Sequence, residues 1–215
     1  MRKEPMSKRR RASGIALAAA LCCGLAIGVV GCSQSGQGSQ GASGGSATEQ
    51  QAAESETRTF TDSAGRTVEV PAQIDRIAPA GHTATQVLLT MAPEKMVTLS
   101  QELSDDQAKY LGESYAELPV TGAAFGSKGD LNKEAVAASG AQILIDTGEL
   151  KDGIAEELDT LQEQLGIPVV MIETTMDTYA DAYEMLGELL GMEERGRELS
   201  EYCKAAYEET TSVMA

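Results

Sequence analysis

Apolar and polar residues alternate along two short runs near residue 60, and the pattern then changes. The two runs in "RTFTDSAGRTVEVP" (58–71) flank the turn-forming residues 62–65, so they predict a β-hairpin. From residue 76 onward, short apolar runs alternate with segments of helical period. This alternation is typical of a parallel sheet with helices on both faces. The pattern therefore predicts an α/β fold with an N-terminal hairpin.

The remaining elements are predicted by range. Apolar runs predict strands at 76–80, 96–100, 119–122, 142–146 and 168–173. Helical periodicity predicts helices at 84–92, 104–112, 132–139, 152–165, 177–190 and 193–213. The helix at 152–165 carries an apolar stripe that we expect to face the sheet, formed by Ile154, Leu158, Leu161 and Leu165.

Several helix ends have recognisable signals. Thr83 and Gln86 have the spacing of a capping box, which predicts Thr83 as the N-cap of the first helix. Asn132 is the expected N-cap of the helix at 132–139, and Gly140 is the expected stop.

The first 56 residues have a different character. Six basic residues lie within 2–11, and the apolar stretch 14–32 follows them, as in a secretory signal. The stretch ends in "VVGC" (29–32), which resembles the lipobox of bacterial lipoproteins, where cleavage exposes a cysteine that takes the lipid. We therefore expect a signal peptide at 1–31 and lipidation of Cys32. The alternative is an uncleaved helix that anchors the chain in the bilayer.

Residues 32–56 are expected to form a flexible tether. The segment is rich in Gly, Ser, Gln, Ala and Glu and has no apolar period, so it cannot bury enough surface to fold. We expect the folded lobe to occupy 57–192 and a long helix to follow at 193–215.

Charge and cysteine content exclude some partners and one kind of cross-link. Without residues 1–31 the chain keeps 11 basic and 32 acidic side chains, a net charge of −21. Nucleic-acid phosphates require a basic surface, so nucleic acid is not an expected partner. Cys203 is the only cysteine after Cys32, which excludes an internal disulfide if Cys32 is acylated.

The polar residues that follow the predicted strands are the candidate site. In an open parallel sheet, ligands bind beyond the carboxyl ends of the strands. We expect the ligand-binding residues to be His82, Thr83, Ser100, Gln101, Phe125, Gly126, Lys128 and Glu149. These loops contain no persuasive Ser/His/acid set, and the single histidine is too little for a histidine-based metal cage. A binding protein without a resident cofactor or metal is therefore favoured over an enzyme.

The chain also resembles a known family, the substrate-binding lipoproteins of ABC importers for iron–siderophores, haem and cobalamin. The resemblance runs through "DSAGRTVEVPAQIDRIAPA" (62–80), "GHTATQVLLTMAPEKMVTLS" (81–100), "LNKEAVAASGAQILID" (131–146) and "LQEQLGIPVVMIE" (161–173). It covers essentially all of 58–215. Each motif alone is weak, and their order and spacing together carry the resemblance.

The resemblance implies a Rossmann-like N-terminal lobe of the class III type. Family members have two similar lobes joined by a long helix, with the ligand held between them. This chain ends within what resembles that inter-lobe helix, so we expect the second lobe to be absent. The sequence does not decide between a fragment, a truncated gene and a genuine half-protein.

Two residues acquire roles from the resemblance. His82 would lie on the cleft wall and contact the ligand; the alternative is an exposed residue at a helix start. Glu134 aligns with a carboxylate that forms a salt bridge with an arginine of the permease. A first-turn carboxylate is also favoured by the helix dipole, so Glu134 has a local explanation as well.

The implied function is transport without covalent chemistry. The protein would act as a monomer that captures a ferric chelate, haem or cobalamin and delivers it to a permease with its ATPase. It would be lipid-anchored to the outer face of the bacterial cell membrane. The main alternative is a single-lobe surface lipoprotein that mediates an interaction unrelated to transport.

Overall fold

The computed structural model describes residues 56–125 and 129–214. The predicted signal peptide, the lipidation of Cys32 and nearly all of the tether lie outside the described residues. The same is true of Gly126 and Lys128. In the described part of the chain, no helix is both long and apolar enough to cross a membrane.

The predicted hairpin is confirmed. Strands β1 (Thr57–Thr61) and β2 (Thr67–Pro71) pair antiparallel, and Phe60 lies opposite Val68. Both side chains are buried, as expected where alternate residues of a hairpin face a core.

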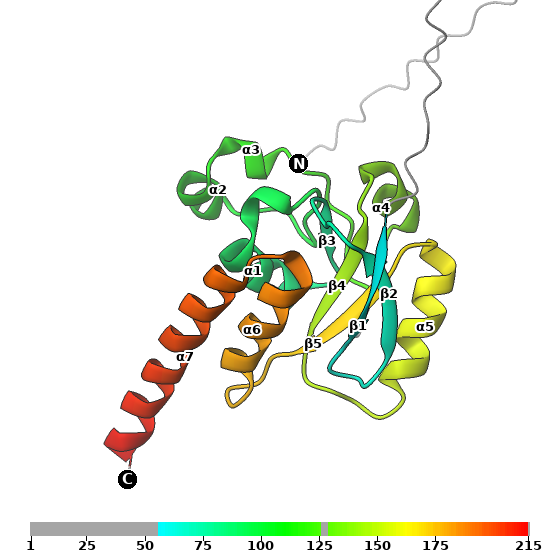
Figure 1. The fold of residues 1–215 in the computed structure, drawn as a ribbon. Coiled ribbons are helices and arrows are strands. Elements are labelled where there is room, and N and C mark those ends of the chain that lie inside the picture. The colour runs from blue at the N-terminus through cyan, green and yellow to red at the C-terminus, as the bar shows by residue number, and fades with distance from the viewer. Residues whose placement is uncertain (1–55, 126–128, 215) are drawn as a thin grey trace, which may run out of the picture. The chain divides into compact units, whose positions relative to one another are not determined.

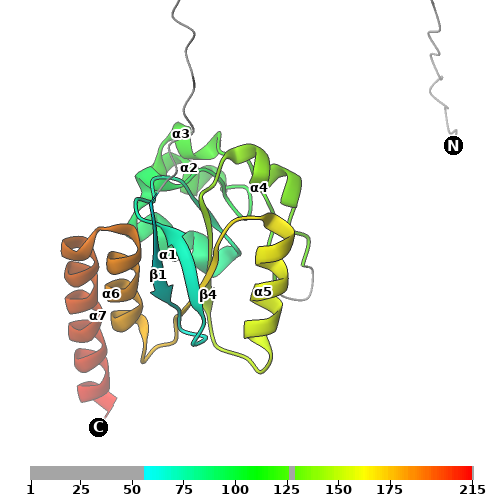
Figure 2. The ribbon, with the colours of Figure 1, turned by 45° about the vertical axis from the view of Figure 1, so that its right-hand side comes forward.

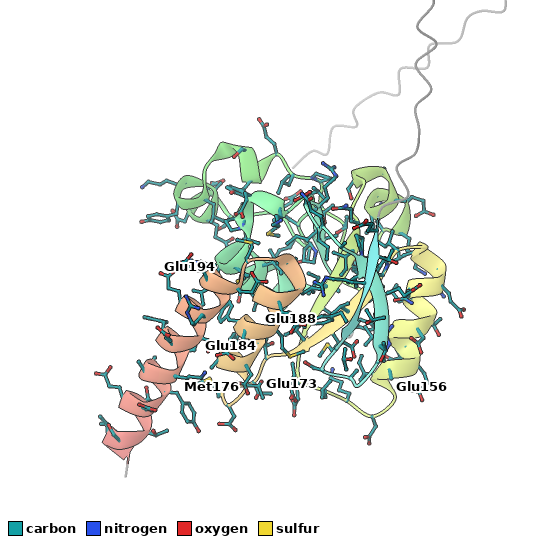
Figure 3. All side chains as sticks on the ribbon, in the orientation of Figure 1. Glu156, Glu173, Met176, Glu184, Glu188 and Glu194 are labelled. Carbon is teal, nitrogen blue, oxygen red and sulfur yellow. The ribbon has the colours of Figure 1, made fainter. Side chains whose placement is uncertain are left out.

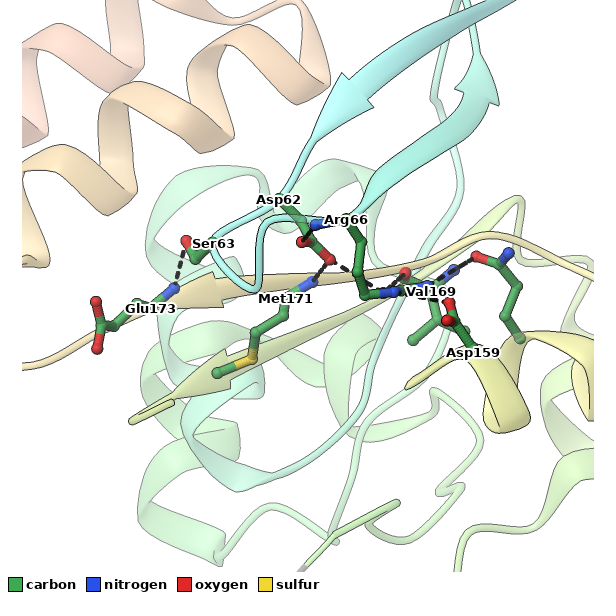
Figure 4. A network of polar contacts seen from close by, with 8 residues as sticks. Asp62, Ser63, Arg66, Asp159, Val169, Met171 and Glu173 are labelled. Atoms are coloured by element: carbon green, nitrogen blue, oxygen red, sulfur yellow. Dashed lines mark hydrogen bonds and ion pairs between the residues drawn. The ribbon is translucent and has the colours of Figure 1, made fainter. Parts of the chain in front are cut away.

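Polar contacts attach the hairpin turn to the last strand of the sheet (Figure 4). The Ser63 hydroxyl accepts a hydrogen bond from the Glu173 backbone N–H at 2.9 Å. The Arg66 guanidinium donates to the Val169 carbonyl at 2.9 Å and to the Asp159 carboxylate at 2.8 Å. One arginine thus joins the hairpin to both a strand and the helix that precedes it.

Three parallel strands form the central sheet, in the order β3-β4-β5. They are β3 (Ile77–Pro79), β4 (Ile143–Gly148) and β5 (Val169–Glu173). Ile77 pairs with Ile143, and Leu144 pairs with Val169.

The two other predicted strands are not regular strands. Residues 96–100 and 119–122 contribute only isolated parallel bridges, Ile77 to Met96 and Leu99 to Val120. Few ladder bonds hold these segments, and Pro119 has no N–H to donate. They nevertheless continue the sheet beyond β3.

Helices cover both faces of the sheet (Figures 1 and 2), which confirms the predicted α/β layering. The helical elements are α1 (His82–Met91), the 3-10 turn η1 (Pro93–Lys95), α2 (Asp105–Leu111), α3 (Glu113–Ala116), α4 (Lys133–Ser139), α5 (Ile154–Leu165), α6 (Tyr179–Leu190) and α7 (Glu193–Met214).

Alternate residues of β4 face two separate cores. Ile143 and Ile145 pack with buried residues of α1 and α6, whereas Leu144 packs with Leu158 and Leu161 of α5. The predicted apolar stripe of α5 is therefore confirmed, because its two other members also pack against the second core.

Helix α7 packs closely on α6. A Cβ atom added to Gly196 would lie 2.5 Å from the Tyr183 carbonyl oxygen and 3.0 Å from the Gly187 Cα. The first distance is too short for a real Cβ contact and the second is tighter than most, so the absence of side chains at Gly187 and Gly196 permits this crossing.

The predicted capping box at Thr83 is wrong. Helix α1 begins at His82, its N-cap is Gly81, and no side chain caps it. The Thr85 hydroxyl instead donates to the Gly81 carbonyl at 3.0 Å. The helix starts earlier than predicted because the extended backbone of Gly81 brings the chain directly from β3 into α1. The predicted N-cap Asn132 and stop Gly140 are confirmed at α4.

Candidate ligand-binding groove

A groove of about 1220 Å³ lies at the carboxyl ends of the strands. Its described lining comes from the segments that follow β3 and β4, from residues 100–101 and 120–125, and from the start of α5. A smaller hollow of about 280 Å³ adjoins it and shares Ala124, Phe125, Asp130 and Glu157 with the groove.

The strand order explains where the groove forms. Across the sheet, the segments follow the order Val120, Leu99, β3, β4, β5. After β3 the chain first adds the segments of Leu99 and Val120 on one side of β3, and it then crosses to β4 and β5 on the other side. Such a reversal opens a crevice beyond the carboxyl ends of the two central strands, where α/β proteins bind ligands. The backbone N–H of Ala80 donates to the Ile145 carbonyl at 2.9 Å and so fixes the end of β3 beside β4.

Three side chains form a hydrogen-bonded chain on one wall. The Thr85 Oγ1 lies 2.7 Å from the Ser100 Oγ, which lies 3.0 Å from the His82 Nδ1. Ser100 is buried and His82 is exposed. The chain thus runs from the core to the groove.

The donors and acceptors in this chain assign the histidine tautomer. The Gly81 carbonyl can only accept, so the single Thr85 hydroxyl proton is donated to it. The Ser100 hydroxyl then donates to Thr85, and its oxygen accepts from His82 Nδ1–H. In the neutral ring, Nε2 therefore keeps a lone pair, which makes it a hydrogen-bond acceptor or metal ligand.

The structure brings most of the predicted site residues together. Those that line the groove are His82, Thr83, Ser100, Gln101, Phe125 and Glu149. The groove wall is therefore where the strand pattern places it, and ligand contact by these residues stays a prediction.

Asp146 is a groove residue that the sequence analysis missed. Burial raises the pKa of its carboxyl to about 6, although the backbone N–H of Thr147 and the charge of Lys151 act in the opposite direction. The sequence pattern places it at the end of an apolar strand. One feature of the sequence could have indicated it: the apolar run "QILID" (142–146) ends in a carboxylate, at the edge of the sheet where ligands bind.

Other missed residues lie in the same region. Lys151 and Glu157 line the groove because α5 begins at Ile154 and carries its first turns over the carboxyl end of β4. Asp130 lines it from the other side, and its carboxylate accepts a hydrogen bond from the Ala123 N–H at 3.2 Å.

Glu134 is separate from the groove. It is exposed in the first turn of α4, and it is not among the groove-lining residues. Among the described residues, no group of three or more His, Cys, Asp or Glu side chains is arranged to hold a metal ion.

Solved structures with the same fold are periplasmic solute-binding proteins. An ABC transporter solute-binding protein from Sulfurospirillum deleyianum DSM 6946 is 20% identical with a TM-score of 0.57, over 67% of this chain and 45% of that chain. A periplasmic solute-binding protein from Veillonella parvula DSM 2008 is 20% identical with a TM-score of 0.58, and the match covers 73% of this chain and 48% of that chain. The haem-binding protein HmuT is 20% identical with a TM-score of 0.50, and the match covers 74% of this chain and 48% of that chain.

These likenesses establish the fold. The chain matches no protein-family model and no curated protein sequence. It spans about half the length of the solved proteins that it resembles. The fold is thus that of a single lobe of a class III periplasmic solute-binding protein, as the resemblance in sequence implied.

Proposed function

We propose that the protein is the substrate-binding component of an ABC importer, and that it captures an iron–siderophore-like complex, haem or cobalamin for delivery to a permease. The observation that carries the proposal is the groove of about 1220 Å³ at the reversal of strand order, in a fold shared with ABC transporter solute-binding proteins. Small-molecule sites are typically concave and about 300–1,000 Å³ in volume, so the groove has room for part of a large complex.

The groove wall formed by His82, Thr83, Ser100 and Gln101 is the proposed contact surface for the ligand. It is polar without an activated nucleophile, because the Ser100 hydroxyl is buried and is committed to Thr85. The wall therefore supports recognition by hydrogen bonds, with Phe125 as an apolar contact. Glu149 contributes a carboxylate to the lining.

Glu134 is the proposed contact with the permease. Its exposure on α4, separate from the groove lining, leaves the carboxylate available to a basic partner while ligand occupies the groove. In an uptake assay with the natural gene, Glu134→Gln should reduce transport and leave ligand affinity within about a factor of two. Lys133→Gln, on the adjacent exposed position, is the matched control.

Lipidation of Cys32 is the proposed means of attachment to the outer face of the cell membrane. A diacylglyceryl group supplies two chains, which stable anchoring requires. Mass spectrometry of the native N-terminus should find a lipid on Cys32, and an intact Met1 would contradict it.

Ligand titration tests the function directly. The protein should bind at least one ferric siderophore, haem or cobalamin, measured by calorimetry and by visible absorption of the ligand. Gln101→Ala should weaken that binding at least about tenfold, whereas Gln164→Ala, outside the large groove, should not. Failure of all three ligand classes to bind would favour the alternative of an interaction lipoprotein.

A further inference from the structure

The described lining of the groove has an excess of negative charge. It contains four carboxylates and one ammonium group, those of Asp130, Asp146, Glu149, Glu157 and Lys151. The described part of the lining therefore presents a ligand with more carboxylates than cationic donors.

The groove carboxylates differ from those on the outer helices by position. Glu156, Glu184 and Glu194 project from α5, α6 and α7 (Figure 3) and are exposed, whereas the four groove carboxylates line one concave site. Three of the four are exposed as well, and only Asp146 is partly buried. Charge interactions are screened less at a partly buried group, so Asp146 bears on ligand choice more than the other carboxylates.

Asp146 is the most significant of the four groove carboxylates. It is half-buried in β4 between the buried residues Ile145 and Thr147, and it lies in register with Met171, which also lines the groove. In the described chain, no cationic nitrogen lies within 4.0 Å of its carboxylate. Burial without an ion pair disfavours its charged form, which agrees with the raised pKa of this carboxyl. A cationic or hydrogen-bond-donating group of a ligand would supply the missing partner.

Two other lining groups are compatible with such a ligand. Thr147 is only 6% exposed and lines the groove, and its buried hydroxyl, which can donate or accept, has no hydrogen-bond partner among the described residues. When its ring is neutral, His82 offers the Nε2 lone pair as an acceptor, as assigned above. Lys151, the one described cation of the lining, is exposed.

We propose that the groove selects metal complexes that carry a positive charge or no charge over anionic complexes, and that Asp146 is the specificity-determining residue that pairs with a donor group of the ligand. This inference rests on the proposed function and narrows its substrate class. An anionic ligand would face three exposed carboxylates and the partly buried Asp146, and juxtaposed like charges oppose binding.

A charge series on one chelate tests the inference. Ferrioxamine B carries one ammonium group outside its iron cage; its N-acetyl derivative is neutral and its N-succinyl derivative is anionic. Calorimetric titration of the protein at pH 7.5 and low salt should give affinity that falls from the cation to the anion by at least about tenfold. High salt should reduce this ratio, because screening weakens the charge interactions.

Asp146→Asn should reduce the cation-to-anion ratio by at least about fivefold. Glu163→Gln, which removes an exposed carboxylate of α5 that does not line the groove, should leave it unchanged. The ratio in the unaltered protein needs no variant, so the test holds even if Asp146→Asn perturbs folding.

The outcomes separate the two proposals. Equal or tighter binding of the anionic chelate, or binding of haem without the cationic chelate, overturns the charge selection and leaves the proposed function intact. If no chelate, haem or cobalamin binds, the proposed function fails and this inference fails with it.

Discussion

The Asp62 carboxylate lies 3.0 Å from the Arg66 guanidinium, and both side chains are almost completely buried beside β5. Asp62 also accepts from the Arg66 backbone N–H at 2.9 Å and from the Met171 N–H at 3.3 Å (Figure 4). The five-residue hairpin turn, 62–66, is thereby joined to the central sheet through one carboxylate.

Loss of the arginine should destabilise the fold strongly. Arg66→Met leaves the Asp62 charge buried without its partner, which typically costs about 3–5 kcal/mol. Urea unfolding followed by circular dichroism measures this change. Glu198→Gln, which breaks an exposed ion pair with Arg195, should cost less than about 1 kcal/mol. Similar losses for the two variants would contradict a structural role for the buried pair.

The pKa of Asp146 predicts a pH-dependent stability. Its value in the fold, about 6, exceeds the ordinary 3.8, so the folded state holds this proton more tightly than the unfolded state. The resulting stabilisation is fully present below pH 3.8 and is lost as the pH rises through about 6. Asp146→Asn should therefore be more stable than the unaltered protein at pH 7.5 by about 2–3 kcal/mol, and the difference should vanish near pH 4.

Denaturant titrations of both proteins across this pH range provide the measurement. The difference between their free energies of unfolding cancels the contributions of the other carboxylates, which both proteins share. Ser212→Ala, which removes no titratable group, serves as the control, with a difference that should not vary with pH. A flat difference for Asp146→Asn would show that its carboxyl is not desolvated.

The hydrogen bonds of His82 predict its tautomer. At a pH where the ring is neutral, long-range ¹H–¹⁵N spectra should show a proton on Nδ1 and an unprotonated Nε2. Ser100→Ala removes the acceptor at 3.0 Å and should shift the ring toward the Nε2–H form. Ser104→Ala, which affects only the capping box of α2, should leave the spectrum unchanged. A predominant Nε2–H form in the unaltered protein would refute the assignment.

The contact between α6 and α7 predicts an unusual response to alanine. Alanine in place of helical glycine usually stabilises a helix by up to about 1 kcal/mol. Gly196→Ala should instead destabilise the protein by about 1–3 kcal/mol, because its Cβ would lie 2.5 Å from the Tyr183 carbonyl oxygen. Thermal unfolding measures the sign, and Ser212→Ala on the exposed part of α7 should have little effect. Stabilisation by Gly196→Ala would show that α7 can shift at no cost.

Hydrogen exchange should distinguish the two halves of α7. Ser200 is buried and its hydroxyl donates a hydrogen bond to the Glu184 carboxylate, whereas every residue from 204 to 213 is exposed. Amides after Ala206 should exchange much faster than those of β4, since little apolar surface holds these turns. Equal protection in the two segments would contradict this.

The sequence predicted most of the fold because local patterns determine it. The hairpin, β3 to β5 and the long helices follow from apolar period and turn residues, and each was placed within a few positions. The segments at 96–100 and 119–122 read as strands because they are apolar, but ladder regularity depends on neighbours and on Pro119. The Thr83 cap failed because Gly81 allowed an earlier helix start, which the capping pattern could not reveal.

The site was predictable only in part, for a related reason. Strand ends indicate which loops meet, so the shared groove lining of His82, Ser100, Gln101 and Glu149 was predictable, whereas their contact with a ligand stays a prediction. Desolvation of Asp146 depends on residues far apart in the sequence, including those of α5, and the partners of Thr85 are equally remote. Such properties arise from packing and have no local signature.

The last core contact of helix α7 has a mechanical consequence. Leu199, Ser200 and Cys203 still pack beyond the glycine contact, whereas the turns after Cys203 are held by exposed bonds, from Lys204 to Glu184 and from Tyr207 to Asp177. Exposed pairs contribute little. Met214 lies about 16 Å beyond Cys203 at roughly 1.5 Å per residue, so a tilt of about 10° at Cys203 would displace Met214 by roughly 3 Å. The last turns of α7 thus enlarge small shifts of the helix pair on the sheet.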